Sequence, residues 1–113
     1  TGLGEWEVLI LQLNVTSAAT DATDTLDVYV QTTIDGTNWV DVYHFTQVLG
    51  NGGAVIHTGK ISKAEPQAMF AHSAALAAGS VRHLFGSEWR VRYAVVDADA
   101  NSAFTFTVYG TFI

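Results

Sequence analysis

The sequence of 113 residues contains no cysteine, one proline and few charged side chains. The absence of cysteine excludes disulfide bonds, a thiolate nucleophile, iron–sulfur clusters and cysteine-ligated zinc. The strongly apolar run Val8–Leu11 covers four residues, whereas a membrane-spanning helix needs about 20. No basic segment followed by an apolar one opens the chain. We therefore expect a soluble chain with no membrane association, stabilised by packing alone.

The charge balance also excludes one class of partner. Eleven acidic and five basic side chains give a net charge of −6, which opposes binding to nucleic acid, because that affinity rests on Lys and Arg neutralising phosphates. Charged residues make up 14% of the chain, against about 25% in typical proteins. The surface must therefore be rich in uncharged polar and apolar atoms, or be partly covered by another chain.

The chain has enough apolar residues to fold. Its apolar fraction is 49%, and it includes 6 Phe, 4 Tyr and 3 Trp, whereas disordered chains are poor in aromatic residues. We find no internal repeat, linker or long charge run that would separate two units. The length and the apolar fraction together predict a single domain over residues 1–113.

A period of two, which is typical of half-buried strands, is clearest near the C-terminus. Apolar side chains alternate with polar ones over residues 88–95 and again over residues 104–112, with a turn-rich stretch between them. This pattern predicts an antiparallel hairpin with one buried face. Residues 26–31 and Trp39–Phe45 predict a second hairpin, because Asp35–Gly36 between them suits a tight turn.

Two further segments complete a set of six predicted strands. Glu5–Val15 is rich in β-formers and nearly continuous in apolar residues, which suggests a strand covered on both faces or lying at a subunit contact. Ala54–Ser62 is a weaker candidate, preceded by a glycine-rich stretch, Gly50–Gly53, that predicts a hairpin loop. Six short strands bounded by Gly, Asn and Asp predict an all-β, mostly antiparallel fold, a single β-sandwich or jelly-roll-like domain.

One segment does not follow the period of two. Residues 64–80 contain seven Ala in 17 residues. Ser62 and Glu65 match a helix capping box, Pro66 suits a first helical turn, and Gly79 suits a helix end. This Ala-rich, non-strand segment is therefore either a short helix or an extended loop or arm that lies on a neighbour.

No residue pattern predicts a metal, cofactor or catalytic site. The four histidines (His44, His57, His72 and His83) are 13, 15 and 11 residues apart, which fits no paired-ligand motif, and no G-x-S-x-G or phosphate-binding glycine motif is present. The Asp97–Asn101 stretch matches the start of a calcium loop, but its sixth and twelfth positions are Ser and Val. We expect it to be an ordinary turn, and expect the carboxylates at positions 21, 24, 27, 35 and 41 to be solvated.

The aromatic residues allow two interpretations. Trp6, Trp39 and Trp89, with the four tyrosines, could stack on sugar rings if several of them line an exposed face. Trp39 and Trp89 each occupy a strand position, however, where an aromatic side chain commonly fills the space between sheets. We favour a role in the core, and a carbohydrate- or receptor-binding module remains the alternative.

Several segments resemble a sequence that recurs in small virion structural proteins of tailed bacteriophages. They are Leu26–Val42 (LDVYVQTTIDGTNWVDV), Phe45–Val48 (FTQV), Ala74–Arg82 (AALAAGSVR), Glu88–Tyr93 (EWRVRY) and Phe104–Val108 (FTFTV). Together they span most of the chain. The D-G-x-x-W element also occurs in discoidin-like sugar- and lipid-binding sandwiches, which are usually longer.

The resemblance implies a non-enzymatic capsid decoration or head-associated protein on the virion surface. Such a protein would bind copies of itself and the major capsid protein or other virion proteins, and would need neither a cofactor nor a catalytic residue. Low charge suits permanent contacts, which are more apolar than transient ones. The apolar residues that we expect at these contacts are Met69, Phe70, Leu76, Phe112 and Ile113.

Overall fold

The computed structural model describes residues 7–17, 24–96 and 104–113. These residues form an all-β fold of seven strands and contain no α-helix, so no helix in the described ranges could cross a bilayer. The strands are β1 (Val8–Ser17), β2 (Thr25–Thr33), β3 (Trp39–His44), β4 (Val48–Leu49), β5 (Val55–Ser62), β6 (Glu88–Val96) and β7 (Thr105–Phe112).

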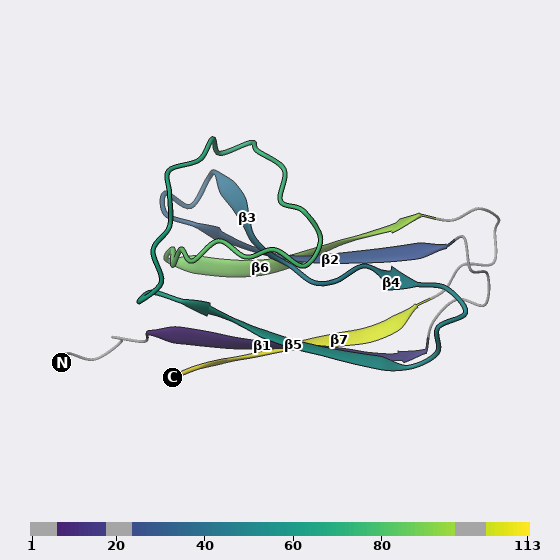
Figure 1. Ribbon diagram of the computed structural model, residues 1–113. Helices are drawn as coiled ribbons and strands as arrows, with labels where there is room; N and C mark the ends of the chain where they lie inside the picture. Colours follow the sequence, from purple (N-terminus) through teal and green to yellow (C-terminus); the bar gives the residue numbers. More distant parts are fainter. Residues whose placement is uncertain (1–6, 18–23, 97–103) are drawn as a thin grey trace.

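The strands form two antiparallel sheets that lie one above the other (Figure 1). The three-stranded sheet has the order β5-β1-β7. In the four-stranded sheet, β2 is central, with β3 and β4 along one edge and β6 along the other. The predicted all-β, mostly antiparallel fold is confirmed. A jelly roll is not confirmed, since that fold has eight strands.

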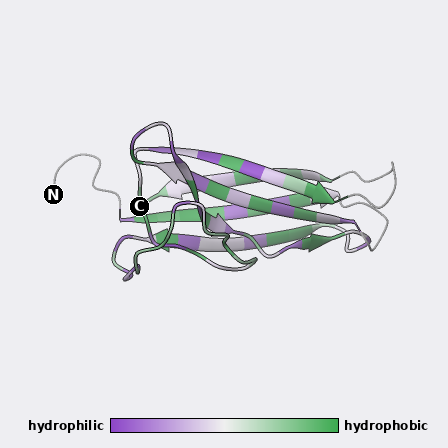
Figure 2. Cartoon of the chain, turned by 90° about the horizontal axis from the view of Figure 1, so that it is seen from above, coloured by the Kyte–Doolittle hydropathy of each residue, from purple (hydrophilic) through white to green (hydrophobic). Residues whose placement is uncertain are grey.

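The two central strands supply most of the core. Along β1, four alternate residues, Leu9 to Val15, are buried, and along β2 burial alternates from Leu26 to Val30, after which every residue is buried. Because successive side chains in a strand point to opposite faces, this alternation places one apolar face of each sheet against the other. Figure 2 shows the resulting apolar and polar bands along the strands. The other face of β1 is only half-buried, so the described residues do not cover β1 on both faces.

One predicted hairpin is confirmed and the other is wrong. β2 pairs with β3 through the turn at Asp35 and Gly36, where Gly36 adopts a φ of 80°. β6 and β7, predicted to pair with each other, lie in different sheets, because β6 pairs with β2 and β7 with β1. Alternation fixes which face of a strand is buried but not which strand lies beside it. The predicted turn between β6 and β7 lies outside the described residues.

The β2–β3 turn is held by one carboxylate. Asp35 accepts hydrogen bonds from the backbone N–H groups of Asn38 (2.8 Å) and Thr37 (2.9 Å), and from the Asn38 side chain and the Thr33 hydroxyl. The backbone hydrogen bond from Asn38, followed by that from Thr37, holds the pKa of Asp35 well below its usual range.

The glycine-rich stretch after β4 is not a hairpin loop. β4 lies beside β2, whereas the following strand, β5, lies beside β1 in the other sheet. Gly50–Gly53 therefore connects the two sheets, and the positive φ values of Asn51 and Gly53 (63° and 70°) help to turn the chain there.

The Ala-rich segment contains no helix. Residues 63–87, which connect β5 to β6, form an irregular loop over the outer face of the four-stranded sheet near β3 (Figure 1). Its C-terminal part pairs with the free edge of β3: Arg82 N–H donates to Val42 O, and His44 N–H to Ser80 O. These tertiary bonds outweigh the helix propensity of alanine, which is a weak local preference.

Candidate interaction site

The side of the molecule bounded by β6 and β7 is open. Each of these strands pairs with a single neighbour, so each has one unpaired edge among the described residues. The two edges lie on the same side, because Tyr93 of β6 contacts Phe106 of β7 with ring centroids 5.3 Å apart, and Trp89 contacts Phe112 at 5.8 Å.

The opposite side, bounded by β3 and β5, is closed by the chain itself. Tyr43 of β3 reaches across the core to Gly59 of β5, so closely that a Cβ atom on Gly59 would overlap the tyrosine hydroxyl. Tyr43 also packs edge-to-face on Phe45, with centroids 4.7 Å apart. The 63–87 segment then pairs with the outer edge of β3. The described chain provides no such cover for β6 and β7.

The core-facing side chains of β6 are consequently exposed. Val91, Tyr93 and Val95 are 44%, 62% and 40% exposed, although their cross-strand partners on β2 are buried. The expectation that this face of residues 88–95 is fully buried is therefore wrong for most of the strand. The period of two is present, but in the described chain β7 covers this face only in part.

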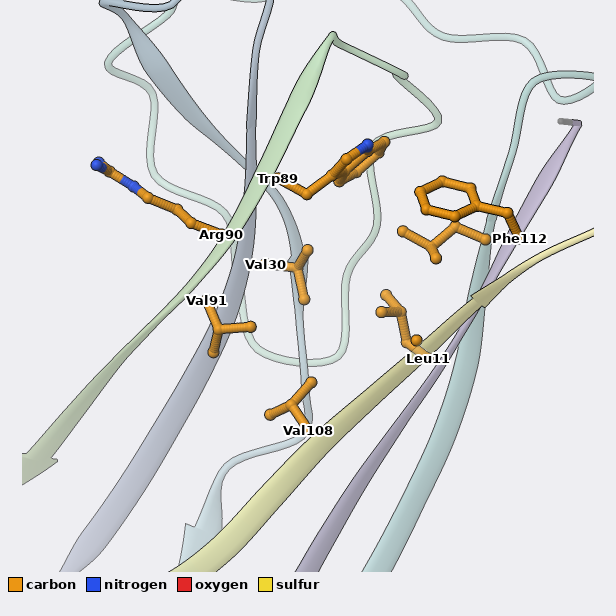
Figure 3. Close-up of a pocket in the computed structure, with 9 residues that line it drawn as sticks. Leu11, Val30, Trp89, Arg90, Val91, Val108 and Phe112 are labelled. Atoms are coloured by element: carbon orange, nitrogen blue, oxygen red, sulfur yellow. The ribbon is translucent and has the colours of Figure 1, made fainter. Parts of the chain in front are cut away.

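An apolar groove of about 200 Å³ runs between the two open edges. Its lining side chains come from both sheets and point toward one another, whereas Arg90 points away from the groove (Figure 3). Gly110 widens the groove, because it stands opposite Leu11 on β1 and has no side chain to fill the space. The lining residues are Leu9, Leu11, Val30, Trp89, Arg90, Val91, Val108, Gly110 and Phe112.

The outer face of the four-stranded sheet is a network of charged and aromatic side chains. The Arg92 guanidinium donates two hydrogen bonds to the Asp41 carboxylate (2.8 and 3.0 Å) and lies 3.6 Å above the Tyr29 ring. Arg90 lies 4.2 Å above the Trp39 ring. One face of each of these rings is thus occupied by a guanidinium, which leaves less ring surface for stacking on a sugar.

The contribution of the Asp41 carboxylate and its partners to stability can be tested through its pH dependence. Burial raises its pKa, but hydrogen bonds from Arg92 and Gln31 and the positive charges of Arg92 and Arg82 outweigh burial and lower it overall. A lowered folded-state pKa stabilises the fold above the unfolded-state pKa, and this stabilisation is lost as pH falls through the folded-state pKa.

We predict that Asp41→Asn lowers the urea midpoint at about pH 6, and that acidification to about pH 3 destabilises the variant less than the wild type. Urea unfolding at both pH values measures this difference. Equal losses in the two proteins would contradict the stabilising role of the Asp41–Arg92 pair.

The histidines do not gather into one site. His44 is buried, with Tyr29 stacked on it at 3.9 Å, and its ring lies between the Leu76 carbonyl (2.8 Å from Nδ1) and the Asp27 carboxylate (2.9 Å from Nε2). His83 accepts a hydrogen bond from Ser62 N–H. The other two are His57, which is half-buried, and His72, which is exposed. Among the residues that the structure describes, no group of three or more His, Asp or Glu side chains could hold a metal ion.

Three of the carboxylates expected to be solvated are not. Asp24 is buried, and Asp27 and Asp41 lie within strands with His44 and Arg92 as partners. Asp35 is exposed, as expected. Asp21, Trp6 and the Asp97–Asn101 stretch lie outside the described residues.

The predicted interface residues divide into two groups. Met69 is 99% exposed and Ile113 is 63% exposed, so both are free to contact a partner. Phe70, Leu76 and Phe112 are half-buried against their own chain: Phe70 lies under the Arg82 guanidinium at 4.1 Å, and Phe112 packs on Phe85 and Trp89. Sequence reasoning missed Val91, Tyr93 and Val95, whose alternation is visible but whose exposure depends on the sheet order.

No protein family matches this chain, and neither a curated protein nor a solved structure is similar to it.

Proposed function

We propose that this chain is a β-sandwich that serves as a non-enzymatic structural protein of a phage virion. Its role would be to decorate and stabilise the capsid surface through contacts with other copies and with the major capsid protein or other virion proteins. The open side bounded by β6 and β7 carries this proposal.

The open side has the physical properties of a surface that another protein covers. An apolar patch on the order of 400 Å² on a soluble chain commonly marks an interaction site. Val91, Tyr93 and Val95 are exposed on the core-facing side of β6, and the groove next to Val91 is lined almost entirely by apolar side chains. Covering them removes this surface from water at little electrostatic cost, because few charges would be desolvated.

The assignment to a phage virion rests on the resemblance of Leu26–Val42 and the later segments to small virion structural proteins. The low charged fraction of 14% agrees with a role in permanent contacts. The groove is lined by apolar side chains and by Arg90, whose guanidinium points outward. Such a lining is better suited to contact with another protein than to catalysis.

Reconstitution on particles tests the proposal. Tailed-phage particles made from the genome that encodes this chain, but lacking it, are mixed with the purified protein and sedimented. We expect saturable binding and greater resistance of the particles to heat, and we expect Val91→Glu to reduce both.

The matched control is Ile56→Glu, which changes an exposed apolar residue on β5 at the opposite side of the molecule. Particles that bind none of the protein, or an encoding genome that makes no tailed particle, would refute the proposal. Saturable binding to a glycan that is lost in Trp39→Ala would instead support a sugar-binding module.

A further inference from the structure

We infer that the unpaired edge of β7 binds the β7 edge of a second copy of this chain, in an antiparallel pairing about a two-fold axis. The pairing would join the two three-stranded sheets into one sheet of six strands. This inference rests on the proposed function and names the partner that covers the open side.

Among the described residues, β7 has none of the features that prevent edge strands from pairing. It is eight residues long and contains no proline and no charged residue, and the structure gives it one pairing partner, β1. Soluble proteins usually protect such an edge with Lys, Pro, a bulge or a covering loop. An eight-residue edge of roughly 26 Å offers a row of backbone donors and acceptors to a second strand.

The distribution of charge indicates that a second copy would bind at this edge and not elsewhere on the surface. Two chains that each carry a net charge of −6 repel one another, so they approach best where neither presents charge. β1 and β7 carry no charged side chain, whereas the outer face of the four-stranded sheet carries Asp27, Asp41, Arg90 and Arg92. Arg90 and Arg92 donate hydrogen bonds to Gln31 and Asp41 on that outer face, and Figure 3 shows that Arg90 points away from the groove.

A two-fold axis makes this contact self-complementary. Identical antiparallel strands can pair with each other about such an axis, and the contact closes after two copies. The grooves of both copies then open toward the same axis. Val91, Tyr93 and Val95 of each copy, exposed in the single chain, would share one apolar space with those of the partner.

A matched pair of lysine variants tests the inference. Thr107 on β7 and Thr58 on β5 are both exposed on the outer face of the three-stranded sheet, but on opposite edge strands. Thr107→Lys is expected to weaken self-association by roughly tenfold or more, because each added charge lies near its counterpart across the axis. Thr58→Lys should leave it within about twofold of the wild type.

Cysteine crosslinking provides a second readout that does not depend on charge. Because the chain has no native cysteine, Thr107→Cys and Tyr109→Cys report directly on contacts between copies. We expect disulfide-linked dimers from at least one β7 variant at micromolar concentration and none from Thr58→Cys. Sedimentation velocity of the wild type should show a dimer over the same range.

Each outcome has a distinct meaning. A wild-type monomer at all concentrations, equal crosslinking at β5 and β7, or an unchanged dimer in Thr107→Lys would overturn the inference. A monomer that still binds particles would overturn it while leaving the proposed function intact, and would assign the open side to another virion protein. A dimer through β7 that binds no particle would support the inference and refute the function.

Discussion

Replacing Arg82 by alanine is expected to lower the free energy of unfolding by about 3 kcal/mol. Arg82 is 7% exposed, and its guanidinium donates hydrogen bonds to the backbone carbonyls of Asp41 (3.0 Å), Ala74 (3.1 Å) and Ala75 (3.3 Å). It also lies 4.1 Å above the Phe70 ring. This side chain thus adds to the backbone pairing that holds the 63–87 segment on the sheet.

The same substitution is expected to release the segment locally. Urea unfolding measures the loss of stability, and hydrogen–deuterium exchange of residues 70–80 measures the release. Arg82→Lys is the matched control, because it keeps the charge but cannot make the forked set of bonds, so we expect it to lie between the wild type and Arg82→Ala. Unchanged exchange in Arg82→Ala would show that other contacts hold the segment.

Truncating Val28 is expected to cost about 2.5 kcal/mol, whereas the same truncation of Val91 is expected to cost about 0.5 kcal/mol. Both valines face the space between the sheets on neighbouring strands, but Val28 is 1% exposed and Val91 is 44% exposed. A cavity forms only where surrounding atoms enclose the lost methyl groups, and Val91 is open to water on one side.

Thermal or urea unfolding of Val28→Ala and Val91→Ala, each as a dilute monomer, measures this difference. Self-association has to be avoided, because a partner that covers Val91 would raise the cost of truncating it. Equal losses for the two variants in the monomer would mean that the open side is in fact closed in solution.

The strands that bury only one face could be predicted from the sequence, because apolar and polar residues alternate along them. Residues 26–31 and 104–112 alternate, residues 39–45 follow the turn at Asp35 and Gly36, and each of these segments forms a strand close to the expected bounds. β4 was not predicted, because two residues are too few to show a period. The β6–β7 hairpin was predicted wrongly, because sequence neighbours usually pair, and here the chain crosses between sheets instead.

The Ala-rich segment shows where local propensity fails. Its capping pattern around Ser62 and Glu65 is a local signal, whereas its conformation depends on the hydrogen bonds that Arg82 and Ser80 make with β3, which is about 40 residues earlier in the chain. Likewise, the open side could not be found from residues 88–95 alone. Their alternation predicted a buried face, and only the sheet order reveals that the described chain leaves that face uncovered.

Hydrogen–deuterium exchange of the protein bound to its particle tests the central claim most directly, because it reports which strand edge is covered. Backbone amides that point out of an unpaired edge exchange quickly unless another chain pairs with them. We predict that, relative to the dilute monomer, exchange is slower in β6 and β7 of the bound protein and unchanged at the outer edge of β5. Slower exchange confined to β5 or to the 63–87 segment, with β6 and β7 unaffected, would contradict the account.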